Sequence, residues 1–596
     1  MQYLKRLILK LDVIFARLGI FVILVIIPYL IISRCHYAYY IALFIGFICI
    51  GCYLIFKKKL FVLINESKVD YWILGIAFIM GLSQVWIVNL MFPNSLIGLD
   101  TWTHMRITTQ ELDIALSGNS NSYGINQLTP ATIGGYFTVM HLYLKSMMDI
   151  FGLNYKWTSL IFVGSVQLVG IIVFVYLIGK ELISRQVGSI ASLLVANASW
   201  VIYFTEWVIP NGIGALFSLI TAYLFIKAYK TNRYDLVWYS LILVVISLLL
   251  HIMVALWVVG TMICICLITE NLDMLNKRKY KGHKVSNLIP LISLILLLAW
   301  YQFTTIGNAI TVTSNDMESM TSFGQEIQYQ QSIVEQQQIA VQSAIVPIVP
   351  IIKDVLNNGN LIEILIDGMG FFLYFGIAVI GCLMMLKSTN LNKSWSILCL
   401  GTLFIGFFPA LFEFQVLKER WWYLGQVFMA IPLAVMIKSI NKKVIMCGVI
   451  VAIVFLSIIG LPSNITNRAF SQNLIVRYAF TSAELSTRDN LTIEQVYQNG
   501  GILGADSYYI AYIQSDIDWY WPQRTKVRGI DEYILSGNFK DCPYGIILIR
   551  EALYNEPFAF GNGSIYKIEY NVLESAKQQG YKELWQKGGV HCLIRK

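Results

Sequence analysis

Long apolar runs alternate with short polar segments along almost the whole chain. A helix that crosses the hydrocarbon core of a bilayer needs about 20 mostly apolar residues. Thirteen runs come close to this length, and the pattern predicts that each forms a membrane-spanning helix. The predicted spans cover residues 17–33, 38–56, 71–91, 157–178, 186–204, 211–229, 234–250, 252–270, 286–305, 361–386, 394–413, 421–438 and 444–461. We therefore expect an α-helical polytopic membrane protein with about 13 transmembrane helices.

The positions of Lys and Arg orient these predicted spans. Basic residues precede the first span and follow every second span after it, as at 57–59 and 277–284. Cytoplasmic loops of membrane proteins carry an excess of Lys and Arg. The N-terminus is therefore predicted to be cytoplasmic, and thirteen spans then place the C-terminus on the outside of the plasma membrane.

Three larger polar pieces fall on the predicted outer side. They are a first outside loop at 92–156, a large Gln-containing loop at 306–360 and the tail at 462–596. Within the first loop, the amphipathic stretch 131–151 is predicted to lie on the membrane surface as a helix. The tail has strand-like runs at 544–550 and 589–595, with a helical stretch near 571–586 between them. It predicts a small extracytoplasmic α/β domain.

Composition agrees with a membrane protein and changes the interpretation of the charge. The chain of 596 residues is 57% hydrophobic and 13% charged, whereas a soluble domain is about 25% charged. The net charge of +9 lies mostly in the predicted cytoplasmic loops, so we expect no nucleic-acid partner. There is no GxxxxGK[ST] phosphate loop. Cys542 and Cys592 in the tail could form a disulfide outside the cell.

Candidate chemistry begins at the start of the first outside loop. Asp100 lies nine residues after a predicted span, and a helix over 100–114 would place His104 on the same face at i+4, with Glu111 further along it. An acid at this depth can serve as a general base or as a metal ligand. The alternative is that Asp100 caps the helix N-terminus.

Two further candidates lie at predicted outer ends of spans. His251 stands in the tight turn between spans seven and eight, either as a functional ionisable group or as a hydrogen-bonded interfacial histidine. The segment 418–423 places Arg420 beside Trp421 on the outer side, against the charge rule. Arg420 could bind a phosphate, with Trp421 and its neighbour Trp422 beside a lipid chain or sugar ring. Alternatively, Arg420 pairs with Glu419 over an aromatic belt.

A first span, an outside loop that opens with Gly98-Leu-Asp100-Thr-Trp-Thr-His104, and surface helices resemble the GT-C superfamily of integral membrane glycosyltransferases. This superfamily includes protein O-mannosyltransferases, lipid A aminoarabinose transferases and oligosaccharyltransferase catalytic subunits. The resemblance implies an N-terminal two-helix addition at 1–70, a catalytic transmembrane domain at 71–461 and the extracytoplasmic domain at 462–596. The Trp-Trp-Asp-Tyr-Gly motif of oligosaccharyltransferases is absent.

The resemblance also implies roles. Asp100 matches the catalytic acid of the first loop, and Arg420 the basic residue that binds lipid phosphate, with His104, His251, Trp421 and Tyr423 as further substrate-binding candidates. Glu206 lies where some members place acidic ligands of a divalent metal, Mg or Mn. Its alternative is an interfacial carboxylate beside Trp207.

Together these features predict a membrane glycosyltransferase. It would take a sugar from a polyprenyl-phosphate-linked donor in the membrane and transfer it to a glycan, lipid or protein acceptor outside the cell, with Asp100 as the general base. A polymerase or ligase of lipid-linked polysaccharide is an alternative. A secondary transporter is a third, although we find no internal repeat of the kind that transporters show.

Overall fold

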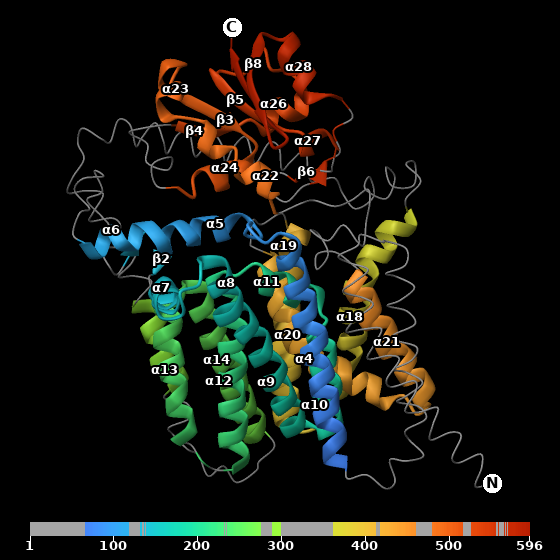
Figure 1. Ribbon diagram of the computed structural model, residues 1–596. Coiled ribbons are helices and arrows are strands. Elements are labelled where there is room, and N and C mark those ends of the chain that lie inside the picture. The colour runs from blue at the N-terminus through green and yellow to red at the C-terminus, as the bar shows by residue number, and fades with distance from the viewer. Residues whose placement is uncertain are drawn as a thin grey trace.

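The computed structural model contains a bundle of apolar helices, a layer of helices across one end of the bundle, and an α/β unit beyond that layer (Figure 1). The described residues are 66–117, 132–133, 136–137, 139–231, 233, 235–275, 289–299, 361–412, 418–459, 479–516, 526–555, 558–559, 565–566, 568 and 570–595. Outside the described residues lie the predicted spans 17–33 and 38–56, the N-terminal addition 1–70 up to residue 65, and the large loop 306–360.

The helices of the bundle follow the predicted apolar runs. They are α4 (Glu66–Met91), α8 (Tyr155–Ser159), η4 (Leu160–Ser165), α9 (Val166–Leu182), α10 (Arg185–Val195), α11 (Ser199–Glu206), α12 (Pro210–Thr231), α13 (Asp235–Leu250), α14 (Ile252–Leu275), α18 (Leu361–Met385), α19 (Asn390–Phe412), α20 (Lys418–Ser439) and α21 (Lys443–Ile459). The run predicted as a single span at 186–204 forms two helices, α10 and α11, which meet at a bend of 57°.

The protein is mostly helical and multi-pass. Within the described residues, four helices are long and apolar enough to cross a membrane, or five if α10 and α11 form one span. Five shorter apolar helices accompany them. The count of about 13 spans and the sidedness of the termini therefore stay predictions.

Helix α20 forms the centre of the bundle. Its most apolar window is 72% buried, against 39–61% for the other three helices that could span, and it packs against α10, α18 and α19. Close approach depends on Gly381 of α18, since a Cβ there would lie 1.9 Å from the carbonyl oxygen of Pro432 in α20. Small residues at such contacts let helix backbones pack closely inside membranes.

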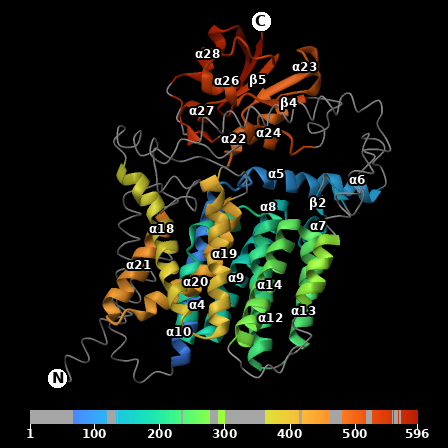
Figure 2. The same ribbon diagram turned by 180° about the vertical axis from the view of Figure 1, so that it is seen from behind.

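A layer of short helices crosses one end of the bundle and lies between it and the α/β unit (Figures 1 and 2). It contains α5 (Leu99–Arg106), the π-helical turn η2 (Ile107–Glu111), α6 (Leu112–Ser117) and α7 (Val139–Phe151). The helix predicted over 131–151 is shorter than expected. Its first residues instead form a two-stranded hairpin, in which β1 (Thr132–Ile133) pairs with β2 (Tyr136–Phe137).

The first outside loop is anchored beneath α5 by a buried lysine. The ammonium of Lys156, in α8, donates to the backbone carbonyls of Asn89 (2.9 Å), Ser95 (2.8 Å) and Phe92. These carbonyls belong to the C-terminal end of α4 and the turn after it, where helical hydrogen bonds are missing. Lys156 thus fixes the turn that leads into α5.

The α/β unit contains a mixed five-stranded sheet in the order β4-β3-β5-β9-β8. Strand β3 (Ile502–Ala505) runs parallel to β4 (Lys526–Gly529) and β5 (Ile546–Arg550), while β9 (Val590–Arg595) is antiparallel to β5 and β8 (Tyr581–Lys587). Both predicted strand runs contain strands, β5 and β9. The surrounding helices are α22 (Ser482–Leu485), η5 (Arg488–Asn490), α23 (Ile493–Gln498), α24 (Ser507–Ile513), α26 (Asp531–Ser536), α27 (Ala552–Asn555) and α28 (Val572–Gln578), and a small pair joins β6 (Phe558–Ala559) to β7 (Ile565–Tyr566).

The helix predicted near 571–586 is wrong in its second half. Helix α28 ends at Gln578, and residues Tyr581–Lys587 form the edge strand β8. Gly588 and Gly589 both have positive φ angles, 58° and 75°, and turn the chain into β9. This backbone conformation suits glycine. Cys542 and Cys592 are buried free thiols, so the suggested disulfide does not form.

Candidate active site

The N-terminal turn of α5 presents Asp100 towards the bundle. The helix begins at Leu99 with Gly98 as its N-cap, and no side chain caps it. Asp100 therefore lies in the first turn and is not the cap, so that alternative is wrong. Among the described residues, none donates a hydrogen bond to the half-buried Asp100 carboxylate, although the positive charge of Arg420 acts on it. The carboxylate is thus available to accept a proton.

Gly98 is required for this entry into α5 by both its backbone and its surroundings. Its φ angle is 87°, and a Cβ atom would lie 2.3 Å from the indole nitrogen of Trp207.

We expect Gly98→Ala to displace the start of α5 and to lower any activity that depends on Asp100 by more than about tenfold, because small misplacements of catalytic groups are costly. Gly152→Ala is a control, since Gly152 also has a positive φ but has open space around its Cβ position. Equal rates for the two variants would contradict a special role for Gly98.

A pair of buried histidines lies behind Asp100. His104 of α5 and His141 of α7 are 3% and 0% exposed, and His104 Nδ1 lies 3.0 Å from His141 Nε2. The N–H of one ring donates a hydrogen bond to the nitrogen of the other, so one of these two nitrogens is unprotonated. Burial and the nearby charges of His141, His251, Arg420 and Arg106 hold the pKa of His104 well below its usual range. His104 is therefore neutral near pH 7.

Arg420 joins this group from the first turn of α20. With the amide of Asn211 oriented so that its oxygen faces Arg420, that oxygen accepts from Nε (3.1 Å) and Nη1 (2.5 Å), and its nitrogen donates to His251 Nδ1 (3.1 Å). The backbone N–H of Met253 also donates to His251 Nδ1 at 3.1 Å. This nitrogen is an acceptor, so the proton of the neutral ring lies on Nε2. Asn211 thus links Arg420 to His251.

Burial and the charge of Arg420 determine which groups of the cluster are neutral and which are charged. Burial raises the pKa of Asp100, and the positive charge of Arg420 opposes part of that rise. Burial together with Arg420 lowers the pKa of His251 to about 4. At neutral pH the cluster therefore combines two neutral histidines, the carboxyl group of Asp100 and the permanent positive charge of Arg420. A raised carboxyl pKa brings a general base closer to the operating pH.

Glu206 occupies the end of α11. It is 5% exposed, and no residue in the described part of the chain makes a hydrogen bond to its buried Oε1 atom. Across the described parts of the chain, no group of three or more His, Cys, Asp or Glu side chains is arranged to hold a metal ion. The role of Glu206 as a ligand of a divalent metal therefore stays a prediction.

The aromatic residues after Arg420 divide between the cluster's edge and the interior. Trp421 is half-buried and packs edge-on against Trp257, with ring centroids 6.1 Å apart. Tyr423 is fully buried, donates to the carbonyl of Gly212 (2.7 Å) and accepts from Gln167 (3.0 Å). The hydroxyl of Tyr423 thus joins α20 to α12 and α9 by hydrogen bonds, which gives this residue a structural role.

No family model and no curated protein matches this sequence. Among solved structures, the chain is similar to the oligosaccharyltransferase AglB from Archaeoglobus fulgidus, in complex with an inhibitory peptide and a dolichol-phosphate. The identity is 12% over 82% of this chain and 70% of that chain, with a TM-score of 0.46. It is also similar to the arabinofuranosyltransferase AftD from Mycobacteria, at 10% identity over 89% of this chain and 40% of that chain, with a TM-score of 0.45.

A third similar structure is ArnT from Cupriavidus metallidurans bound to undecaprenyl phosphate. The identity is 10% over 89% of this chain and 98% of that chain, with a TM-score of 0.31.

The structure brings together four of the residues selected from sequence, Asp100, His104, His251 and Arg420. Sequence reasoning missed His141 and Asn211. His141 looked like one polar interruption in a surface helix, and Asn211 follows Pro210 at the start of α12, where an asparagine usually satisfies the backbone. Asn211 lies at the start of the predicted span 211–229, which was the available signal, whereas His141 lies in the middle of the predicted helix 131–151 and carried none.

Proposed function

We propose that this protein is a membrane glycosyltransferase that takes its sugar from a polyprenyl-phosphate-linked donor. The observation that supports this most is that Arg420, in the first turn of α20, lies close enough to Asp100 for its positive charge to lower the pKa of that carboxyl group. A group transfer from a lipid phosphate requires a base on one side of the sugar carbon and positive charge on the other.

Asp100 would act as the general base. Its carboxylate would accept the proton of an acceptor hydroxyl as the acceptor oxygen bonds to the anomeric carbon of the sugar. The bond from that carbon to the phosphate oxygen would break, and its electron pair would leave with the polyprenyl phosphate. A single carboxylate suits such a one-step displacement with inversion, because no second carboxylate is needed as a nucleophile.

Arg420 would stabilise the leaving phosphate. A guanidinium offers a fork of N–H donors that matches phosphate oxygens, and the N-terminal turn of α20 adds the positive end of a helix dipole. Asn211 accepts from Nε and Nη1 and so fixes the plane of the guanidinium. His251, neutral and held by Asn211 and Met253, would complete the polar side of the site.

The place of this cluster in the fold agrees with a lipid-linked donor. Helices α5 and α6 run across the ends of the bundle helices, so their level would correspond to a membrane surface (Figure 1). A polyprenyl chain would then lie beside the bundle while its phosphate reaches Arg420. Two of the similar structures contain a polyprenyl phosphate, dolichol-phosphate in one and undecaprenyl phosphate in the other, which is the lipid that the proposed donor would release. The acceptor would be a glycan, lipid or protein on the outer side of the plasma membrane.

The proposal is tested by a transfer assay with the purified full-length protein in lipid vesicles. Radiolabelled polyprenyl-phosphate sugars, one sugar at a time, are supplied with a cell-envelope extract. We expect label to move from lipid to the extract with at least one donor, while the matching nucleotide sugar gives none. Transfer from the nucleotide sugar, or no transfer from any lipid-linked donor, would contradict the proposal.

A further inference from the structure

The α/β unit holds α5 through Arg106, a residue outside the cluster described above. Arg106 is 3% exposed and donates from Nε to Glu111 Oε1 (2.7 Å) and from Nη1 to the backbone carbonyl of Gln514 (2.7 Å). Glu111 is itself fully buried. Gln514 is the C-cap of α24 in the α/β unit, where unpaired carbonyls attract a cation.

The π-helical turn after α5 makes this ion pair possible. In an α-helix, residues five apart point roughly 140° away from each other. The turn η2 over Ile107–Glu111 has wider spacing, so it brings Glu111 onto the side of Arg106. A regular helix over 100–114 was predicted to place Glu111 on the face shared by Asp100 and His104. The π turn changes the direction of the Glu111 side chain, and Glu111 pairs with Arg106 instead. Such π turns occur frequently at functional sites.

A second contact joins the α/β unit to the same face of α5 through Trp102. Trp102 lies four residues before Arg106. Its ring packs edge-on against Tyr512, with 5.1 Å between centroids, and at a tilt against Phe480, with 6.0 Å between centroids. Trp102 and Arg106 are roughly 200° around the helix from Asp100 and His104, at about 100° per residue. One face of α5 therefore meets the α/β unit, and the opposite face meets the cluster with Arg420.

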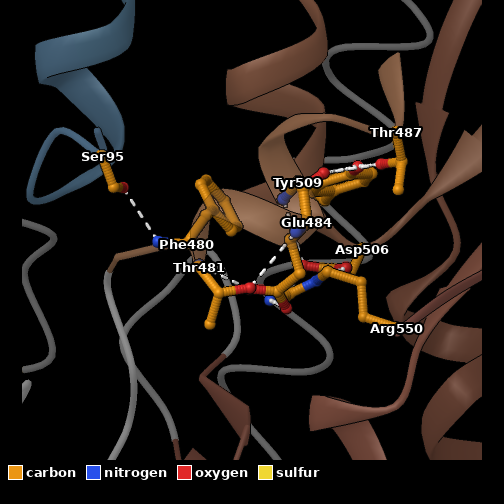
Figure 3. Close-up of polar contacts among 8 residues, drawn as sticks. All are labelled: Ser95, Phe480, Thr481, Glu484, Thr487, Asp506, Tyr509 and Arg550. Carbon is orange, nitrogen blue, oxygen red and sulfur yellow. Dashed lines mark hydrogen bonds and ion pairs between the residues drawn. The ribbon is translucent and has the colours of Figure 1, made fainter. Parts of the chain in front are cut away.

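A buried ion network fixes Phe480, a residue of the α/β unit that contacts Trp102 (Figure 3). Arg550 donates from Nε and Nη2 to Asp506, both at 2.7 Å, and lies 3.5 Å from Glu484. Its guanidinium covers the ring of Phe480 at 5.2 Å. The backbone N–H of Phe480 donates to Ser95 Oγ (2.8 Å) in the turn before α5. These bonds connect the sheet, Phe480 and the entry to α5 in one rigid arrangement.

We propose that Arg106 is a positioning residue through which the α/β unit fixes α5, and with it Asp100 and His104, against the end of the bundle. The consequence for catalysis rests on the proposed function, whereas the effect on α5 itself does not. Removing Arg106 leaves the buried Glu111 carboxylate and the Gln514 carbonyl without this donor, so the C-terminal end of α5 loosens.

The test compares Arg106→Gln with Arg488→Gln in the full-length protein. Arg488 is the matched control, because it contacts the same Tyr512, with its guanidinium 4.8 Å from the ring, but belongs to the α/β unit. Hydrogen exchange of the α5 amides is measured in vesicles. Arg106→Gln is expected to accelerate exchange over residues 99–106 by at least about tenfold, the change expected from losing a hydrogen bond to a charged group. Arg488→Gln is expected to leave it unchanged.

A second measurement follows Asp100 without any substrate. Dicyclohexylcarbodiimide modifies protonated carboxyl groups, and the labelling that disappears in Asp100→Asn reports Asp100. In Arg106→Gln the midpoint pH of this labelling is expected to fall, because a loosened α5 exposes Asp100 to water. Arg106→Lys keeps the positive charge but loses the planar fork of N–H donors, so its labelling midpoint is expected to lie between those of the wild-type protein and Arg106→Gln. This variant replaces Arg106→Gln in the test if Arg106→Gln does not fold.

Unchanged exchange of α5 and an unchanged labelling midpoint in Arg106→Gln would overturn this inference. Neither readout requires sugar transfer, so the outcome is separate from that of the proposed function. If the wild-type protein transfers no sugar but α5 loosens as expected, the positioning role stands and the proposed function fails. If the wild-type protein transfers sugar but α5 does not loosen in Arg106→Gln, the proposed function stands and the positioning role of Arg106 is wrong.

Discussion

Asp100→Asn is expected to reduce the rate of sugar transfer by about 10²–10⁴-fold, the usual contribution of a positioned general base. Asparagine has nearly the same shape as aspartate but cannot accept the proton of an acceptor hydroxyl. Because no described residue donates a hydrogen bond to the Asp100 carboxylate, the substitution breaks no hydrogen bond within that part of the chain. The loss should therefore appear in kcat while the KM for the donor changes little.

Asp113→Asn is the matched control for this prediction. Asp113 lies in α6 of the same surface layer, is half exposed and pairs with Lys145 at 3.1 Å. Exposed ion pairs contribute little to stability, so Asp113→Asn should retain the wild-type rate. Size-exclusion profiles establish that both variants are folded. Transfer by Asp100→Asn at the wild-type rate would remove Asp100 from the role of base.

Arg420→Gln is expected to reduce transfer by roughly 10²–10³-fold, the range found when one group that stabilises developing charge is removed. In the proposed function, the Arg420 guanidinium would be the main positive charge beside the leaving phosphate. Part of the loss should also appear as weaker donor binding, because the donor carries a negative phosphate before reaction. Arg420→Lys is expected to retain part of the rate, since lysine supplies charge without the planar fork.

Arg233→Gln is the control for the charge change itself. Arg233 is exposed and pairs with Asp235 at 2.8 Å in the turn between α12 and α13, away from the cluster around Arg420. Its substitution should leave the rate and the KM for the donor unchanged. If Arg420→Gln behaves like this control, the phosphate is stabilised by other groups and the proposed role of Arg420 is wrong.

Apolar run length identified helices well because it reflects a strong physical requirement, burial of about 20 residues in hydrocarbon. The same pattern placed Asp100, His251 and Arg420 near helix ends on one predicted side, and their mutual influence in the structure agrees with that placement. Positions at helix ends could be predicted because the spans are roughly parallel rods whose ends meet at two surfaces.

Local departures from regular structure could not be predicted from periodicity. The π turn at Ile107–Glu111 shifts the helical register, so Glu111 pairs with Arg106 instead of extending the Asp100 face. Strand β8 forms where a helix was expected, because its partner β9 provides the hydrogen bonds that its own sequence does not specify. Asn211 bonds with Arg420 across more than 200 positions of sequence, a contact that no local pattern reveals.

The pH dependence of transfer connects the two proposed roles. Asp100 must be ionised to act as a base, so kcat/KM falls as the pH drops through its pKa, which burial raises above the ordinary value. Arg420 lowers that pKa, and removing its positive charge should raise it further. Because Arg420 also lowers the pKa values of His251 and His104, the comparison is repeated in a background that lacks both of these rings, His104→Asn with His251→Asn.

The measurement that tests the central claim most directly is therefore the kcat/KM–pH profile of the double variant His104→Asn with His251→Asn, compared with the profile of the same double variant carrying Arg420→Gln. If Asp100 and Arg420 form one transfer site, the acid limb moves to higher pH when Arg420 is removed. An acid limb that stays in place, or moves to lower pH, would contradict a shared site.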